Sequence, residues 1–124
     1  MEDKKKVLLV EDEEKISGMY RDVLLENGFE VLVAETVRQG LEKAKIGKID
    51  LILLDILLPE ESGIAFLRKL RKSFENIEMP VVVVVSNYST ETIREEAFSL
   101  GVKDYLLKTD FTPQSLVEKI KEYL

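Results

Sequence analysis

The sequence contains no cysteine and no histidine. Without cysteine the chain cannot form disulfides or use a thiolate as a nucleophile. Without histidine, a Ser-His triad and the usual zinc sites are excluded as well. Any metal must therefore be bound by oxygen atoms, which are the ligands of hard cations such as Mg²⁺ and Ca²⁺. The chain also cannot itself be a phosphohistidine donor.

Long apolar runs are missing too. The densest run, Val81 to Val85, is far too short to cross a bilayer. The beginning, MEDKKKVLLVEDEE, has no apolar stretch of signal-peptide length, so we expect a cytoplasmic protein without a membrane partner. The formal net charge of -6 argues against direct nucleic-acid binding, because phosphate contacts require clustered lysine and arginine.

The length and composition fit one soluble globular domain. The chain has 124 residues, of which 45% are hydrophobic and 34% charged. We expect a domain covering residues 1–124, because no linker or repeat interrupts the sequence and the last expected helix extends to the last residue, leaving no output domain.

Five apolar runs alternate with five amphipathic segments along the chain. The expected strands are residues 6–10, 30–34, 51–54, 81–85 and 103–107. The expected helices are residues 13–27, 36–47, 62–74, 90–101 and 112–124. This alternation predicts an α/β fold: a doubly wound, five-stranded parallel sheet of order 2-1-3-4-5, flavodoxin-like, with right-handed crossovers.

The ends of these helices carry recognisable signals. Thr36, with Gln39 three residues later, predicts a capping box, and Thr112 before a proline predicts another helix start. Glycines are expected to end three helices, at positions 28, 47 and 101. In the first helix, a buried stripe is predicted at Ile16, Met19, Tyr20, Val23 and Leu24.

The stretch DLILLDILLPEESG, residues 50–63, is the most informative part of the chain. Its four apolar residues 51–54 are typical of a strand buried on both faces, and Asp55 follows at the carboxyl end. Ligands of open parallel sheets bind outside the carboxyl ends of the strands, which makes Asp55 a candidate reactive group. A strand-terminal aspartate is equally common as a turn cap, so the other strand ends decide its role.

Polar residues follow three further strands directly. They are Glu11 and Asp12, Ser86, and Lys108. The acidic pair has a second interpretation as a helix cap, but the predicted strand order brings all four strand ends to one edge of the sheet. Close carboxylates repel, so this arrangement requires a cation, and Mg²⁺ (or Mn²⁺) with open positions for phosphate oxygens is suited to it. Lys108 and Ser86 would stabilise a phosphoryl group during transfer onto Asp55.

Asp55 begins the pattern D-x-x-L-P-x-x-x-G, which runs through Pro59 to Gly63. Along the chain, the acidic pair precedes this pattern, and the hydroxyl and the lysine follow it. The chain resembles the response-regulator receiver domains of two-component signalling over essentially its whole length, like the single-domain chemotaxis regulators. The resemblance implies that Asp55 is the phosphoacceptor and a metal ligand. It also implies the roles of the remaining site residues: Asp12 as direct Mg²⁺ ligand, Glu11 as ligand through water, the Leu57 backbone carbonyl as a further ligand, Lys108 as the family's lysine, and Ser86 and Tyr105 as switch residues.

The implied function is phosphorelay signalling. Asp55 would accept the phosphoryl group, with Mg²⁺, from a histidine kinase or histidine phosphotransfer protein. The domain would promote its own phosphorylation and slow autodephosphorylation without being an enzyme in the usual sense. Phosphorylation would draw Ser86 toward the phosphoryl group, let Tyr105 turn inward, and change the face of the fourth helix, fifth strand and fifth helix. A downstream protein would bind there, and the chain would be a monomer or a phosphorylation-dependent dimer.

Two positions depart from the family pattern. Thr109 stands where a proline, often with a cis bond, usually follows the lysine, so the loop is expected to differ. Asn87 stands where alanine or glycine usually follows the switch hydroxyl, and it is expected to crowd the site. Leu57, Asn87 and Tyr88 are expected around the water approach to Asp55, which predicts a long-lived phosphorylated form.

Three other functions remain open from the sequence. A flavin- or nucleotide-binding module would need a glycine-rich or Ser/Thr-rich loop after the first strand, where the chain has EDEEK. An aspartate-nucleophile phosphatase would need a D-x-D signature there, which Asp12-Glu13-Glu14 does not supply. A receiver that has lost phosphorylation and only binds proteins would share this fold.

Overall fold

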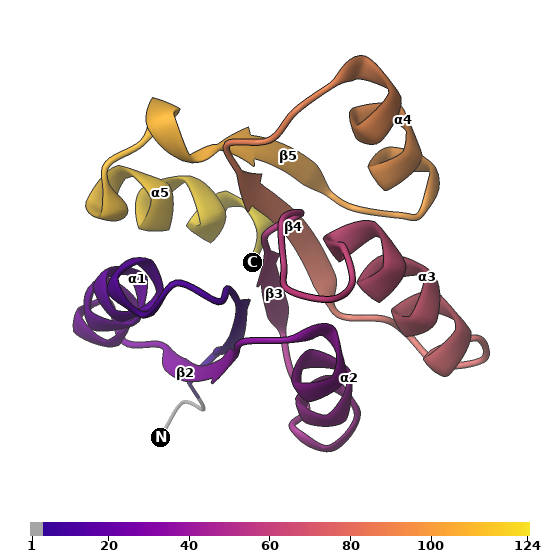
Figure 1. Ribbon diagram of the computed structural model, residues 1–124. Coiled ribbons are helices and arrows are strands. Elements are labelled where there is room, and N and C mark those ends of the chain that lie inside the picture. The colour runs from indigo at the N-terminus through magenta and orange to yellow at the C-terminus, as the bar shows by residue number, and fades with distance from the viewer. Residues whose placement is uncertain (1–3) are drawn as a thin grey trace.

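The computed structural model describes residues 4–124, so the first three residues of the expected domain lie outside the described part. Five strands form one parallel sheet in the order β2-β1-β3-β4-β5, which confirms the predicted topology (Figure 1). The strands are β1 (Lys6–Val10), β2 (Glu30–Ala34), β3 (Leu51–Leu54), β4 (Val81–Ser86) and β5 (Asp104–Leu107).

Helices cover both faces of the sheet. They are α1 (Glu14–Glu26), α2 (Val37–Ile46), α3 (Gly63–Ser73), α4 (Glu91–Ser99) and α5 (Pro113–Ile120). Figure 1 shows α1 and α5 on one face and α2, α3 and α4 on the other. Neighbouring strand residues alternate between the two layers: Leu8 and Val10 join the core under α2 to α4, and Val7 and Leu9 join the core under α1 and α5. A central parallel strand therefore needs apolar residues on both faces.

Side-chain caps begin four of the five helices. Their cap residues are Thr36, Ser62, Thr90 and Thr112, each of which accepts a hydrogen bond from a backbone N–H in the first turn. At Thr36 the expected reciprocal bond goes elsewhere, because Gln39 accepts from the Glu35 N–H. The complete capping box is at Thr112, where Ser115 supplies the second bond.

The three glycines predicted to end helices all lie at helix ends: Gly28 and Gly101 follow the C-caps of α1 and α4, and Gly47 is itself the C-cap of α2. Gly28 and Gly101 have positive φ values of 87° and 96°, as expected for left-handed helix ends. Gly47 is different, with φ -89°, and the left-handed residue is Lys48, with φ 50°. The last helix also ends earlier than predicted, because α5 stops at Ile120 and a 3₁₀ turn, Lys121–Tyr123, follows.

The prediction that Met19 is buried is wrong. Met19 is 51% exposed, whereas Ser17 and Leu24 are buried. Met19 lies two residues after Ser17, about 160° around the helix from it, so it lies outside the face that Ser17 and Leu24 bury. Ser17 can be buried there because its hydroxyl donates a hydrogen bond to the Glu14 carbonyl within the same helix.

The strand register brings the candidate residues together. Leu54 pairs with Val10 on one side and with Val84 on the other. Glu11 and Asp55 each directly follow one of these paired residues, so they lie next to each other at the edge of the sheet. The loop after Asp55 folds back tightly, since a Cβ at Gly63 would lie 2.4 Å from the Asp55 carbonyl oxygen. Only glycine tolerates that approach. Within residues 4–124, no helix has both the length and the apolar character required to span a membrane.

Candidate functional site

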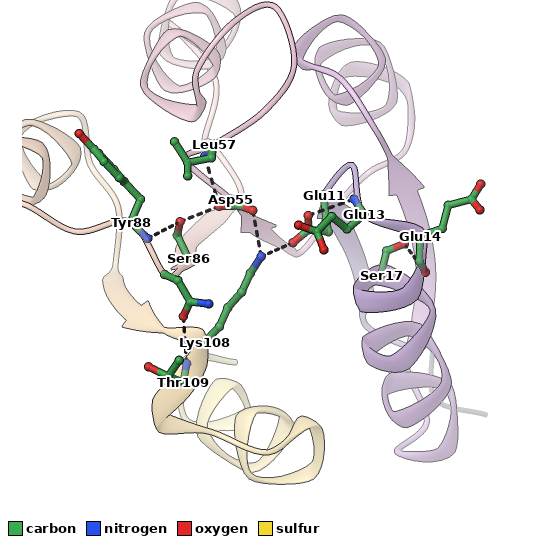
Figure 2. A network of polar contacts seen from close by, with 11 residues as sticks. Glu11, Glu13, Glu14, Ser17, Asp55, Leu57, Ser86, Tyr88, Lys108 and Thr109 are labelled. Carbon is green, nitrogen blue, oxygen red and sulfur yellow. Dashed lines mark hydrogen bonds and ion pairs between the residues drawn. The ribbon is translucent and has the colours of Figure 1, made fainter.

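Asp55 directly follows β3 and is 7% exposed. The Leu57 N–H at 3.2 Å and the Ser86 hydroxyl at 2.6 Å donate to its Oδ1. The Lys108 ammonium donates to Oδ2 at 2.9 Å. Figure 2 shows the carboxylate between Ser86 and Lys108. Both carboxylate oxygens are thus held by donors, which fixes the direction of the side chain.

Lys108 connects two buried carboxylates. It follows β5 and begins a 3₁₀ turn, Lys108–Asp110, from which its ammonium reaches Asp55 and also Glu11 Oε1 at 2.5 Å. Burial by itself would lower the pKa of Lys108, but the hydrogen bonds to the two carboxylates outweigh this effect and raise the pKa. Lys108 is therefore a fixed positive charge at neutral pH.

Glu11 is the second buried carboxylate, 5% exposed. Burial raises its pKa, the hydrogen bond from Lys108 opposes this change, and the charge of Asp55 adds to it. Its Oε2 accepts the Glu13 N–H at 3.2 Å. Glu13 is the N-cap of α1, and its own side chain makes no cap bond. Glu11 therefore acts as a helix-end acceptor, which was one interpretation of the acidic pair, and also pairs with Lys108, which the sequence did not predict.

Three carboxylates meet at this point. Glu11, Asp12 and Asp55 each offer one oxygen atom, and these atoms all lie within 4.8 Å of one another. Glu11 and Asp55 are buried while Asp12 is exposed, so the group opens toward solvent on the side of Asp12. Oxygen ligands from carboxylates at such spacing suit a hard divalent cation, and the residues fit the predicted Mg²⁺ site. The predicted contribution of the Leu57 carbonyl stays a prediction.

Ser86 is the last residue of β4 and is fully buried. Its oxygen donates to Asp55 and accepts the Tyr88 N–H at 3.2 Å. Figure 2 shows the Tyr88 ring directed away from Asp55, and this residue is 40% exposed. The expectation that the Tyr88 side chain flanks the approach to Asp55 is therefore wrong. The hydrogen bond to Ser86 turns the Tyr88 backbone toward the site and its ring outward.

Tyr105 already lies inward, 3% exposed, in the middle of β5, which is the position that was predicted for the phosphorylated form. Its hydroxyl donates to the Tyr88 backbone carbonyl, and the Arg94 guanidinium carbon lies 4.9 Å from the centre of its ring. The Tyr105 hydroxyl is protonated and can donate at neutral pH, and burial raises its pKa further above the usual value. The sequence predicted Tyr105 as a switch residue but gave no signal for Arg94, because the pairing of a helix residue with a strand residue depends on tertiary packing.

The two departures from the family pattern contact each other. The Thr109 N–H donates to Asn87 Oδ1 at 3.1 Å. A proline at position 109 would have no N–H to donate, so Asn87 and Thr109 form a pair that links the β4–α4 and β5–α5 loops. No cis peptide bond occurs in residues 4–124, which includes the bond before Thr109. Asn87 thus contacts the neighbouring loop. The only hint of this contact in the sequence was that positions 87 and 109 both depart from the family pattern.

Comparison with known proteins agrees with this geometry. The family profile described as "Response regulator receiver domain" matches residues 7–121. The phosphate regulon transcriptional regulatory protein PhoB of Escherichia coli (strain K12) is 36% identical over 117 residues, which are 94% of this chain and 50% of that protein. The KDP operon transcriptional regulatory protein KdpE of the same organism is 41% identical over 102 residues, 82% of this chain and 44% of that protein. The chain spans about half the length of these curated relatives.

Solved structures show the same fold. The CheY-like response regulator receiver domain protein from Methanospirillum hungatei JF-1 superposes with a TM-score of 0.88 at 30% identity, over 98% of this chain and 94% of that one. The chemotaxis protein CheY4 of Vibrio cholerae gives a TM-score of 0.89 at 25% identity, over 98% of this chain and 100% of that one.

Proposed function

Because this chain belongs to the response regulator receiver domain family, a signalling family of two-component systems, we propose that Asp55 accepts a phosphoryl group from a phosphohistidine of a partner protein. The family excludes the flavin- or nucleotide-binding module and the aspartate-nucleophile phosphatase. The single observation that carries the proposal is the buried Asp55 carboxylate, oriented by Lys108 and Ser86 at the sheet edge.

In the proposed transfer, an Asp55 oxygen attacks phosphorus. The O–P bond forms as the N–P bond to the donor histidine breaks, and the histidine nitrogen keeps the bonding electron pair and takes up a proton. Lys108 and Ser86 now donate to Asp55 and lie where they can donate to phosphoryl oxygens after transfer. Orientation and charge stabilisation are the main contributions a protein makes to such a reaction.

We propose that Asp12, Asp55 and the Leu57 carbonyl bind Mg²⁺ (or Mn²⁺) directly and that Glu11 acts through water. When bound, the ion neutralises charge on the phosphoryl oxygens. Glu11 is already engaged by Lys108 whereas Asp12 is exposed, which supports Asp12 as the direct ligand. Asp12→Ala should then weaken Mg²⁺ binding, measured by calorimetric titration, far more than Glu11→Ala. Equal losses would contradict this assignment.

The proposal extends to partners and location. The protein itself is cytoplasmic, and a histidine kinase or histidine phosphotransfer protein supplies the phosphoryl group. Residues 1–124 act as one receiver domain with slow autodephosphorylation. A downstream protein, or a second copy after phosphorylation, binds the face of α4, β5 and α5. Hydrogen bonds through Tyr88, in the loop that leads into α4, connect Ser86 with Tyr105 of β5, and this connection supports that choice of face.

The test is intact-mass spectrometry after incubation with acetyl phosphate, with and without Mg²⁺. We expect one phosphoryl group on the wild type with Mg²⁺, little without it, and none on Asp55→Asn. Incorporation that survives in Asp55→Asn would overturn the proposal. Absence of incorporation in the wild type would favour a receiver that only binds proteins.

A further inference from the structure

A continuous chain of contacts leads from Asp55 to the surface of α4. The Ser86 hydroxyl donates to Asp55, and the Tyr88 N–H donates to the Ser86 oxygen. The Tyr105 hydroxyl donates to the Tyr88 carbonyl. Arg94 then covers the Tyr105 ring. Each contact shares a residue with the next, so a displacement of the Tyr105 ring reaches the Ser86 hydroxyl through one loop residue.

Arg94 is the outermost member of this chain. It contacts Tyr105 twice, through the guanidinium over the ring at 4.9 Å and through Nη1, which donates to the Tyr105 carbonyl at 3.4 Å. Arg94 is half-buried and also lines a surface groove of about 640 Å³ on α4 with Thr90 and Phe98. The contacts therefore begin at an accessible side chain and end at a carboxylate that is 7% exposed.

We propose that Arg94 is a positioning residue that holds Tyr105 inward and thereby keeps Ser86 in place for phosphoryl acceptance by Asp55. A β5 edge residue with its ring near a loop can turn outward unless something covers it. Arg94 supplies that cover by cation–π attraction and by its bond to the backbone of the same residue. Its effect reaches Asp55 only through Tyr105, Tyr88 and Ser86.

The inference rests on the proposed phosphorylation of Asp55, so its test has two readouts. The first is the rate of phosphorylation by acetyl phosphate with Mg²⁺. The second is the ¹⁹F spectrum of protein labelled with 3-fluorotyrosine, in which each of the four tyrosines gives one signal. Tyr105→Phe identifies the Tyr105 signal by its disappearance.

Arg94→Gln is the informative variant and Arg38→Gln is its matched control. Arg38 is an exposed arginine of α2 that pairs with Glu42 on its own helix, so both variants remove one exposed or half-exposed positive charge. We expect Arg94→Gln to move the Tyr105 signal toward that of free fluorotyrosine and to slow phosphorylation by about two- to fivefold, the size of one such contact. Arg94→Lys should restore part of both effects, and Arg38→Gln should change neither.

Thermal unfolding separates positioning from simple destabilisation, because a purely structural Arg94 would lower the melting temperature and leave the Tyr105 signal in place. A Tyr105 signal in Arg94→Gln identical to wild type, or a rate identical to Arg38→Gln, would overturn the proposal. If the wild type takes up no phosphoryl group, the proposed function fails. The ¹⁹F shift would then show separately that Arg94 does or does not hold Tyr105.

Discussion

Two aspartates lie at opposite ends of β3, and the fold gives them different surroundings. Asp50, at the amino end, is half-buried and accepts the Lys6 backbone N–H at 2.8 Å. Asp55, at the carboxyl end, is 7% exposed and accepts from a backbone amide, a hydroxyl and an ammonium. The residue type is the same, so what distinguishes Asp55, the residue proposed to react, is the set of neighbours that the adjacent strand ends supply.

The lysines at the two ends differ in the same way. Lys6 pairs with Glu30 at 3.7 Å, with side chains 31% and 55% exposed. Such a surface pair contributes about 1 kcal/mol or less. The Lys108 side chain is 11% exposed and is shared by two carboxylates that are still more buried, with side chains 6% and 8% exposed. Removal of Lys108 leaves two buried negative charges facing each other, whereas removal of Lys6 leaves a solvated one.

The largest effect is therefore expected for Lys108→Ala, with Lys6→Ala as its control. Loss of the fixed charge should reduce the rate of phosphorylation by acetyl phosphate about 10²- to 10³-fold, as for other donors to developing charge. Lys6→Ala should leave the rate unchanged and alter the free energy of unfolding by about 1 kcal/mol or less. Similar phosphorylation rates for the two variants would show that Lys108 has no greater role in the reaction than the surface lysine Lys6.

A smaller loss is expected for Ser86→Ala, which removes one donor to Asp55. A hydrogen bond to a charged group is worth about 1.5–3 kcal/mol, so the rate should fall about ten- to hundredfold. Ser86→Thr retains the hydroxyl and should recover most of the rate. Ser89→Ala, at an exposed position of the same loop, should match wild type. A Ser86→Ala rate equal to Ser89→Ala would show that the hydroxyl does not act on the reacting group.

The sequence was sufficient for the strand order and for the convergence of Glu11, Asp12, Asp55, Ser86 and Lys108, because apolar runs and strand-end residues depend on local patterns. It was insufficient where tertiary packing decides. The exposure of Met19 depends on how α1 is rotated against the sheet, and the left-handed conformation of Lys48 after α2 was not predicted. Arg94 lies in α4 and Tyr105 in β5, and the hydrophobic periodicity of each segment does not predict a contact between them.

The lifetime of the phosphorylated form should respond modestly to Leu57. Leu57 is 58% exposed beside Asp55 and its side chain cannot orient a water molecule, so Leu57→Asn should speed decay by several-fold. The Tyr88 ring is directed away from Asp55, so Tyr88→Glu should have the smaller effect of the two (Figure 2). Decay of phosphorylated protein followed by intact-mass spectrometry makes the comparison. Unchanged decay in Leu57→Asn would show that this side chain does not control water access.

The smallest effect is expected for the pair Asn87 and Thr109. A double-mutant cycle of Asn87→Ala and Thr109→Pro, measured by urea unfolding, should give a coupling energy of about 0.5–1.5 kcal/mol, the worth of one neutral hydrogen bond. Thr109→Pro should thus cost less stability when Asn87 is already absent. Additive changes would mean that the contact between these loops contributes nothing to stability.

The most direct test of the difference between Asp50 and Asp55 is to locate the phosphoryl group on the unmodified wild-type chain. Borohydride reduces an aspartyl phosphate to homoserine, and peptide mass spectrometry then identifies the converted residue. After incubation with acetyl phosphate and Mg²⁺, we predict homoserine at position 55 and unchanged aspartate at positions 12 and 50. Homoserine at position 50 or 12, with aspartate retained at 55, would contradict the account.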